Sequence, residues 1–357
     1  VSNDIKDRGS AKYKTTTGSR EYYTPDAFTF GDKELSGIWV GKFETSSSNP
    51  SASNGGGNVT NLDPMIKPNV ISWRNINVSN AFNVSIKMND SGNRYGFSSN
   101  VDTHMMKNSE WGLVSYLSQS KYGKFGNTDF SGSNKEIYQN KSDKYITGCS
   151  YGTPSNGNTD YGCQYTYDIE GSGTGASTTG NVYGIYDMSG GSWEYVISNY
   201  NNVVGSSGFS VPLTLDSKYY NLYTSDNDSD ACNEEECLSH SLNETGEWYG
   251  DARAMINNTY PWMARSGYYF DSISSGIFSF GSNGGANYTT SSFRLVTVNS
   301  KVDTRIKVVN DSGEVVDYLK YSDGSYVTTD DTVKIIPGFS DSYAMDVENG
   351  STEDKTS

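Results

Sequence analysis

Small neutral polar residues and tyrosine dominate this chain, and they limit the kind of core that it can build. Hydrophobic residues make up 34% of the sequence, below the roughly 45–50% that is usual for soluble globular chains. Disordered chains are poor in aromatic residues and rich in charge, whereas this chain has 28 Tyr and only 19% charged residues. The composition therefore predicts short strands and many turns, stabilised by tyrosine and tryptophan faces instead of aliphatic helices.

The chain is acidic, with a formal net charge of −15 at pH 7. Nucleic-acid binding depends on a basic surface that neutralises phosphates, so we expect no nucleic-acid partner. No apolar run approaches the roughly 18 residues that a membrane-spanning helix needs. We therefore expect no membrane span.

The four cysteines fall into two local pairs, Cys149 with Cys163 and Cys232 with Cys237. Four cysteines allow three disulfide connectivities, and the sequence alone does not distinguish them; we favour the two local pairs. The Cys232-x4-Cys237 spacing is also compatible with half of a zinc site, but no second pair of suitable ligands accompanies it. Because disulfides are typical of oxidising compartments, we expect an extracellular, cell-surface or virion location.

Composition divides the chain into three parts. Residues 1–25 are polar and lack hydrophobic periodicity, which is typical of a tail or linker. The main domain is predicted over 26–298. From 299 to 357, β-rich runs alternate with turn sequences, which predicts hairpins of a small β module. We expect this module to serve attachment or contact between copies in a homo-oligomer or larger assembly.

Two local elements stand out within the main domain. Residues 37–43 form an apolar run that predicts a strand. Residues 109–117 give the clearest helix, since Trp111, Val114 and Leu117 share one face and Ser109 is a suitable N-cap.

Six short motifs resemble, in order, those of the formylglycine-generating-enzyme/sulfatase-modifying-factor family. The longest is the run GNVYGIYDMSGGSWEY at 180–195, and the others lie at 39–44, 68–73, 106–111, 265–267 and 292–296. The family has a C-type-lectin-like fold. The resemblance therefore implies an α+β domain of this type over 26–298, with short twisted strands, few helices and long loops.

The residues that carry the family's chemistry are not in place. Formylglycine-generating enzymes bind copper through two cysteines near the end of the domain, whereas no cysteine follows Cys237 here. Their ergothioneine-type relatives bind iron through three histidines, and this chain has only His104 and His240. We therefore expect no catalytic residues and no certain cofactor. The resemblance suggests a structural calcium ion beside Asp187 and Glu194, although Gly191 stands where the family motif has Asn.

The segment 262–296 resembles the variable region of proteins that are diversified by retroelements and displayed on a C-type-lectin-like fold. In such regions, randomised AAY-type codons encode Tyr, Asn, Ser, Asp and related residues, but never Lys, Glu, Met, Gln or Trp. None of these five residue types occurs from 266 to 292. Antibody loops also bind their targets with Tyr, Ser, Gly and Asn. The pattern indicates a binding surface; the alternative is an ordinary loop-rich β surface in a chain already rich in these residues.

Positions in this segment divide into two predicted classes. We assign the display of ligand-binding side chains to Tyr268, Phe270, Asp271, Ile273, Ser274, Ile277, Ser279, Ser282, Asn283, Asn287, Tyr288 and Thr290. The predicted scaffold positions are Gly267, Gly276, Phe278, Phe280, Gly284, Ala286, Phe293 and Arg294.

These features predict a non-catalytic protein that binds a protein or glycan on a cell surface. Such a protein would be a phage receptor-binding component or a bacterial adhesin or pilus-like subunit. Two alternatives stay open. One is a structural subunit of an extracellular assembly that self-associates through 300–357, and the other is a diverged formylglycine-generating-type oxidoreductase.

Overall fold

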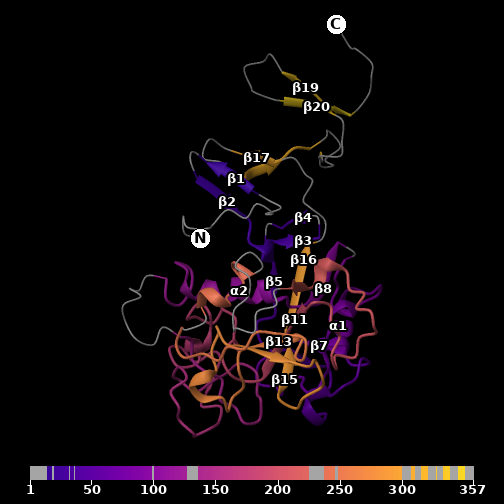
Figure 1. The fold of residues 1–357 in the computed structure, drawn as a ribbon. Coiled ribbons are helices and arrows are strands. Elements are labelled where there is room, and N and C mark those ends of the chain that lie inside the picture. The colour runs from indigo at the N-terminus through magenta and orange to yellow at the C-terminus, as the bar shows by residue number, and fades with distance from the viewer. Residues whose placement is uncertain are drawn as a thin grey trace. The chain divides into compact units, whose positions relative to one another are not determined.

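The fold is seen in a computed structural model (Figure 1). It describes residues 24–31, 33, 35, 37–98, 100–126, 136–224, 237–242, 244–245, 248–299, 319–320 and 327, and the backbone alone of the other helix and strand residues given below. The chain divides into two compact units, Val1–Ser300 and Lys301–Ser357. Each unit is described by itself.

The first unit is a mixed α+β structure with few helices and several small sheets. Its α-helices among the described residues are α1 (Val78–Ile86) and α2 (Asn108–Gln119). Single 3-10 turns lie at Asp26–Phe28, Ser53–Gly56, Lys87–Asn89, Thr174–Ala176, Ser217–Tyr219, Asn243–Thr245 and Ser272–Ser274. The strands are β1 (Lys14–Thr17), β2 (Arg20–Tyr23), β3 (Thr29–Phe30), β4 (Lys33–Glu34), β5 (Trp39–Val40), β6 (Ser46–Ser47), β7 (Pro64–Met65), β8 (Val101–Met105), β9 (Cys149–Ser150), β10 (Tyr165–Thr166), β11 (Trp193–Tyr200), β12 (Asn221–Tyr223), β13 (Trp262–Arg265), β14 (Phe280–Asn283), β15 (Ser291–Phe293) and β16 (Leu295–Asn299).

The strand β11 organises the larger sheet. The sheet order is β12-β11-β13-β14, and β15 also pairs with β11. Antiparallel pairing with β13 aligns Glu194 with Arg265, and parallel pairing with β15 aligns Trp193 with Ser291. A second sheet has the order β5-β16-β8. From Glu194 to Tyr200, every residue of β11 is buried, as expected for a strand that is covered on both faces.

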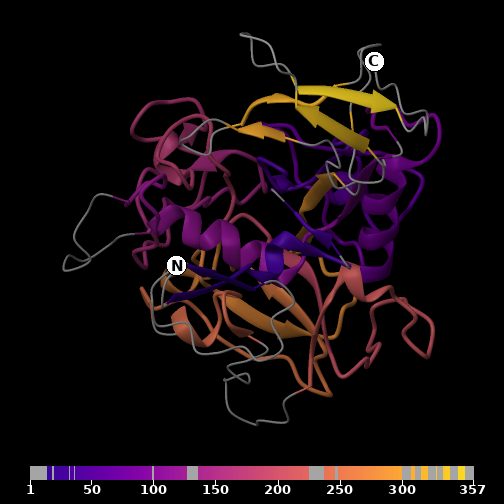
Figure 2. The same cartoon turned by 90° about the horizontal axis from the view of Figure 1, so that it is seen from above.

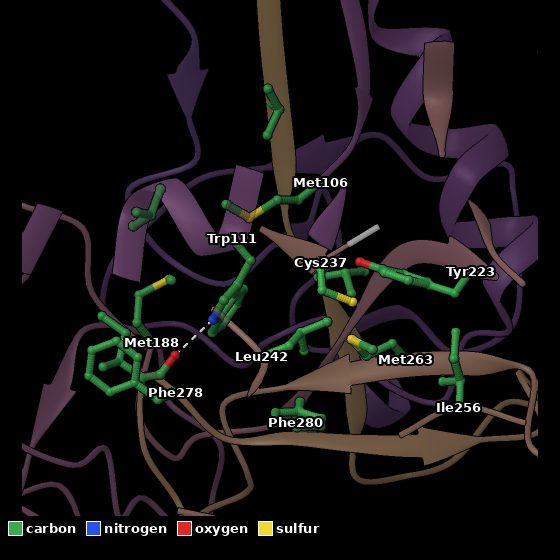
Figure 3. Close-up of a cluster of buried hydrophobic side chains, with 14 of the residues drawn as sticks. Met106, Trp111, Met188, Tyr223, Cys237, Leu242, Ile256, Met263, Phe278 and Phe280 are labelled. Atoms are coloured by element: carbon green, nitrogen blue, oxygen red, sulfur yellow. Dashed lines mark hydrogen bonds between the residues drawn. The ribbon is translucent and has the colours of Figure 1, made fainter. Parts of the chain in front are cut away.

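The two helices cover opposite faces of β11. Val196 packs into one hydrophobic cluster with Trp111 of α2, whereas Ile197 packs into the other with Phe82 of α1. Because neighbouring residues of a strand point to opposite faces, α1 and α2 lie on either side of it, as the two views of the ribbon also show (Figures 1 and 2). These two clusters form most of the core, and a smaller third cluster lies around Phe43 and Tyr186. The cluster around Trp111 is rich in aromatic and sulfur-containing side chains (Figure 3).

The predicted helix at 109–117 is confirmed, and it extends from Asn108 to Gln119. The prediction that Ser109 is the N-cap is wrong, because Lys107 occupies that position. The first turn is instead closed by Glu110, whose Oε2 accepts a hydrogen bond of 2.8 Å from the Lys107 backbone N–H. A helical carboxylate in this place satisfies an otherwise unpaired donor.

The predicted strand at 37–43 is reduced to two residues, Trp39 and Val40. Pairing with β16 stops at Val40↔Val296, and Arg294 of the same chain segment donates from Nη1 to the Gly41 carbonyl at 2.8 Å. The Gly41 backbone N–H still donates to the Leu295 carbonyl at 2.8 Å, so a side chain and the backbone together hold the chain beyond the strand. Within the predicted tail of residues 1–25, β1 and β2 form an antiparallel hairpin.

The second unit contains two antiparallel hairpins. β17 (Lys307–Val309) pairs with β18 (Val315–Tyr318), and β19 (Val333–Pro337) pairs with β20 (Met345–Asn349). Both pairings agree with the hairpins that the sequence predicts in this part of the chain. Of the helices in the described part of the chain, none has the length and apolar character to cross a membrane.

Candidate functional site: an aromatic face on the variable segment

The segment 262–296 forms one hairpin and two surface loops. β13 and β14 pair with Trp262 opposite Asn283 and Arg265 opposite Phe280. The loop 266–279 joins these strands, and the loop 284–290 leads from β14 to β15. Both loops are therefore anchored at strands whose register is fixed on each side.

Ten of the twelve predicted display positions are solvent-accessible. Phe270 and Ile273 are each 53% exposed and Tyr288 is 45% exposed. The others are the exposed Asn287 and the half-buried Tyr268, Asp271, Ser274, Ser282, Asn283 and Thr290. Whether they bind a ligand stays a prediction.

The prediction that Ile277 and Ser279 are displayed is wrong, because both are fully buried. Ile277 belongs to the core cluster around Trp111. Its carbonyl accepts hydrogen bonds of 2.9 Å from the Trp111 indole N–H and 3.1 Å from the Ser115 hydroxyl (Figure 3 draws the first of these). A residue held by both its side chain and its carbonyl has no surface to display.

Most of the predicted scaffold positions are buried, as expected. Phe278, Phe280, Phe293 and Arg294 are all fully buried or nearly so. Gly276 is required by a close approach, since a Cβ at this position would lie 2.1 Å from the Asp251 carboxylate. Gly267 has φ of +72°, in the left-handed region that favours glycine. Gly284 and Ala286 are half-buried.

Five aromatic side chains gather where the loop 266–279 meets the long loops before β11, and we call them the aromatic face: Tyr145, Tyr161, Tyr268, Tyr269 and Phe270. The rings of Tyr161 and Phe270 are stacked with centroids 5.1 Å apart, and Tyr268 stacks on Phe270 at 6.1 Å. Tyr269 meets Tyr145 and Tyr161 edge-on, at 5.0 and 5.5 Å. These separations lie in the favourable range for aromatic pairs.

The hydroxyl groups of the aromatic face differ from most buried tyrosine hydroxyls of the chain. Among the described residues, the hydroxyls of Tyr145, Tyr161, Tyr268 and Tyr269 form no hydrogen bond. Tyrosine in this state offers a rigid apolar ring together with a free donor and acceptor. Sequence reasoning missed Tyr145 and Tyr161, since both lie more than a hundred residues before the variable segment. It also missed Tyr269, which lies within that segment but was not assigned to either class of positions.

Two buried cations, Arg74 and Lys141, lie beneath the aromatic face. The Arg74 guanidinium carbon is 3.7 Å from the centroid of Tyr145, and the Lys141 ammonium is 5.1 Å from that of Tyr161. Neither residue was predicted from the sequence. Their positions depend on contacts with rings that are far away or unpatterned in the sequence, so no local pattern could have signalled them.

A disulfide closes the loop that carries part of the face. Cys149 and Cys163 are bonded, as the local pairing predicts. Tyr161 lies two residues before Cys163, and Tyr145 four before Cys149. Cys237 is disulfide-bonded as well, while Cys232 lies outside the described residues.

The two predicted calcium ligands belong to a buried hydrogen-bond network. The Asp187 carboxylate accepts from the backbone N–H groups of Glu44 and Gly148 and from the Asn140 amide, at 2.9 to 3.2 Å. Glu194 accepts from Arg294 Nε at 2.9 Å and also from its Nη2. Burial raises the pKa of Glu194 to about 7, against the opposing effect of Arg294.

These carboxylates do not fit a calcium site. Calcium requires about six to eight oxygen ligands, whereas the oxygens of Asp187 and Glu194 are already occupied by N–H donors. No group of three or more His, Cys, Asp and Glu side chains in the described part of the chain could hold a metal ion. The arrangement serves instead to join β11, Arg294 and the loop at 148.

The two histidines lie in separate buried networks. His104 Nε2 is 3.0 Å from Glu110, and burial opposes while Glu110 and Asp102 favour its charged form, so that its pKa is raised. His240 lies 2.8 Å from the Tyr223 hydroxyl and 2.9 Å from Asp26. The structure thus does not bring them together as a pair of metal ligands.

Comparison with known proteins finds a similarity among solved structures only. The chain matches no protein-family model and none of the curated proteins. Among solved structures it is similar to Treponema denticola variable protein 1, with 15% sequence identity and a TM-score of 0.32; the match covers 80% of this chain and 98% of that chain. At this TM-score the similarity supports no conclusion about fold or function.

Proposed function

We propose that this protein is a non-catalytic binding protein that uses the aromatic face to hold a protein or glycan on a cell surface. The observation that carries the proposal is the free surface of the face: Phe270 is 53% exposed, and the four tyrosine hydroxyls have no partner among the described residues. Contiguous exposed aromatic groups on a monomer usually mark an interaction site. An adhesin or a phage receptor-binding component would present such a face.

We further propose that the scaffold is C-type-lectin-like and that the loops 266–279 and 284–290 are diversified. The six sequence motifs support the first statement, together with the short strands and few helices of the first unit. Support for the second comes from the division between buried Phe278, Phe280 and Phe293 and the accessible residues between them. Diversification of this kind changes the ligand while the core stays the same.

The gene provides a direct test of diversification. We expect AAY-type codons at accessible positions such as Tyr268, Asp271, Asn287 and Tyr288, and a near-identical template repeat beside a reverse transcriptase gene. Variants from related isolates should differ at these positions and agree at Phe278 and Phe280. Substitutions spread evenly over buried and accessible positions would contradict the proposal.

An extracytoplasmic location follows from the same proposal. The Cys149–Cys163 disulfide supports it, since such bonds persist in oxidising compartments and are rare in the cytosol.

Binding itself is tested without knowledge of the natural ligand. The purified protein is used to select from a random peptide display library and to probe a glycan array. Each binder is then measured against a face variant (Tyr161→Ala, Tyr268→Ala, Phe270→Ala). The matched control removes three aromatic side chains that are exposed elsewhere (Trp39→Ala, Tyr122→Ala, Tyr183→Ala).

We expect binders to lose affinity for the face variant and to keep it for the control. Central aromatic anchors commonly contribute about 2 kcal/mol or more each, so the combined loss should exceed about a hundredfold. Binders that lose affinity equally for both variants, or for neither, would overturn the proposal. If only the glycan binders, or only the peptide binders, lose affinity for the face variant, that result identifies the class of ligand.

A further inference from the structure

We propose that Arg74 and Lys141 are positioning residues for the aromatic face, which hold Tyr145 and Tyr161 from beneath before any ligand arrives. This inference rests on the proposed function, because it assigns to the two cations the preorganisation of the same surface.

Arg74 joins three segments at one edge of the face. Its guanidinium carbon lies 3.7 Å from the ring centroid of Tyr145, and its Nη1 donates to the carbonyl of Thr289. Tyr145 in turn contacts Tyr269 at 5.0 Å. The guanidinium thus connects the chain after Trp73 with the loop of Tyr145 and with the variable loop 284–290.

Lys141 connects chain segments in the same way at the edge of the face that contains Tyr161. Its ammonium lies 4.8 Å from the ring centroid of Tyr151 and 5.1 Å from that of Tyr161, and it donates to the carbonyl of Asn158. Tyr161 then contacts Phe270 at 5.1 Å and Tyr269 at 5.5 Å. The loop from Tyr151 to Tyr161 is therefore folded around one buried ammonium group.

These cations are costly to keep, which argues for a role beyond filling space. Arg74 is 9% exposed and Lys141 is 1% exposed, and among the described residues neither forms an ion pair within 4.0 Å. The Arg74 Nε–H has no hydrogen-bond partner there either. Burying a charge without an ionic partner is unfavourable. Attraction to the ring faces and to carbonyl oxygens offsets part of this cost. The more distant carboxylates of Glu44, for Arg74, and Asp160, for Lys141, also favour the charged forms, although burial still lowers the pKa of each cation.

The aromatic face combines residues from the predicted variable segment with supporting residues from outside it. Arg74, Lys141, Tyr145 and Tyr161 all lie outside the predicted variable segment, and they support Tyr268, Tyr269 and Phe270, which lie within it. A surface that is rigid before binding loses less conformational entropy when its ligand arrives. Different residues at 268 and 270 would thus rest on the same supports.

The test measures amide hydrogen exchange by mass spectrometry in the free, full-length protein. Arg74→Met and Lys141→Met remove each charge and keep an unbranched side chain. We expect exchange to accelerate about tenfold or more in peptides covering 268–274 for both variants. Arg74→Met should also affect 287–290, and Lys141→Met should affect 151–162.

Lys42→Met is the matched control. Lys42 lies 4.9 Å from the Tyr167 ring centroid and 5.4 Å from that of Phe43, in an aromatic cluster away from the variable segment. Its loss should accelerate exchange near 167 and 186 and leave 268–274 unchanged. Equal acceleration of 268–274 by all three variants would mean general destabilisation and would overturn the inference.

Two further variants cover the case that a charge-removing variant does not fold. Tyr145→Leu and Tyr161→Leu keep the buried cation and most of the side-chain volume but remove the ring between cation and face. Either should accelerate exchange at 268–274, and unchanged exchange there would overturn the inference. Because exchange is measured without ligand, this outcome is separate from the binding experiment: rigid loops that bind nothing would refute the proposed function alone.

Discussion

Two aromatic clusters in the first unit have nearly the same ring geometry and opposite surroundings. In the buried cluster, Phe43 meets Tyr167 at 5.2 Å and Tyr186 at 5.5 Å, with the Lys42 ammonium over all three rings. The aromatic face likewise combines ring contacts of 5.0 to 6.2 Å with cations. Ring packing alone therefore does not distinguish a structural cluster from a binding surface.

The polar groups make the distinction. The Tyr186 hydroxyl donates within the protein, with the carbonyls of Tyr167 at 2.8 Å and Asn181 at 3.1 Å as its neighbours. Burial raises the pKa of Tyr186 to about 12. On the aromatic face, the hydroxyls have no such partners among the described residues. A tyrosine cluster whose hydroxyls are bonded within the protein has no polar group left for a ligand, whereas the hydroxyls of the aromatic face can bond to water or, as we propose, to a ligand.

The largest expected effect separates the two clusters by stability. Phe43→Ala removes a ring that is 4% exposed and should lower the free energy of unfolding by about 3–5 kcal/mol. Phe270→Ala removes a ring that is 53% exposed and should lower it by less than about 1 kcal/mol. Urea unfolding followed by circular dichroism measures both. Similar losses for the two variants would show that the face is part of the core.

The next effect is on binding. Tyr161→Ala should weaken a selected peptide or glycan by about 2 kcal/mol, near thirtyfold in Kd. Tyr167→Ala, in the buried cluster, should change Kd only in proportion to unfolded protein. Isothermal titration at a temperature well below the melting transition compares them. A Tyr161→Ala protein that binds as tightly as the wild type would remove the distinction.

A pH-dependent effect on stability is expected from two buried carboxylic acids, Asp251 and Glu136, that lie next to the loop 266–279. The Asp251 carboxylate accepts from the Phe278 backbone N–H at 3.0 Å and lies beside the buried Glu136. Burial raises the pKa of Asp251 to about 7, and burial together with Asp251 raises the pKa of Glu136 well above its usual range. The folded protein therefore retains protons that the unfolded chain releases above about pH 4.

The sign follows from these raised pKa values. The protonated forms of Asp251 and Glu136 favour the folded state. Their contribution to the free energy of unfolding is fully present below about pH 4 and is lost as the pH rises through about 7. Glu136→Gln removes one of the two acids and leaves an amide that can donate to Asp251. We expect the melting temperature of the variant, relative to that of the wild type, to increase as the pH rises from about 4 to about 8. A difference between them that does not change with pH would contradict the shared environment of the two acids.

The smallest expected effect is that of removing an exposed aromatic side chain that belongs to no cluster. Trp39 is 79% exposed and, among the described residues, contacts no other ring. Trp39→Ala should change the free energy of unfolding by no more than about 0.5 kcal/mol and should leave binding unchanged. A loss of binding equal to that of Tyr161→Ala would mean that exposure is sufficient and that clustering is not required.

The sequence predicts the buried half of the variable segment better than its surface. The sequence assigns Phe278 and Phe280 to the scaffold and their neighbours Ile277 and Ser279 to display. Such alternation of buried and displayed residues would hold in a strand. However, β14 begins only at Phe280, and 277–278 is a turn, so the alternation does not apply. Two adjacent residues of a turn can both point inward.

The face itself was only half predictable. Tyr268 and Phe270 carry a local compositional signal, but Tyr145 and Tyr161 lie in a Gly/Ser/Asn-rich stretch without periodicity. Their approach to Tyr269 and Phe270 depends on long-range folding of the loops around Arg74 and Lys141. Such contacts are set by tertiary structure and leave no pattern in neighbouring residues.

The pairing of β11 with both β13 and β15 has a practical consequence for protein engineering. The loop 266–279 begins after Arg265, opposite Glu194, and the loop 284–290 ends before Ser291, opposite Trp193. Adjacent residues of one buried strand therefore fix the outer ends of both loops. A combinatorial library that randomises only Tyr268, Phe270, Ile273, Asn287 and Tyr288 would alter no strand pair, and every member would inherit the same frame for selecting new binding specificities.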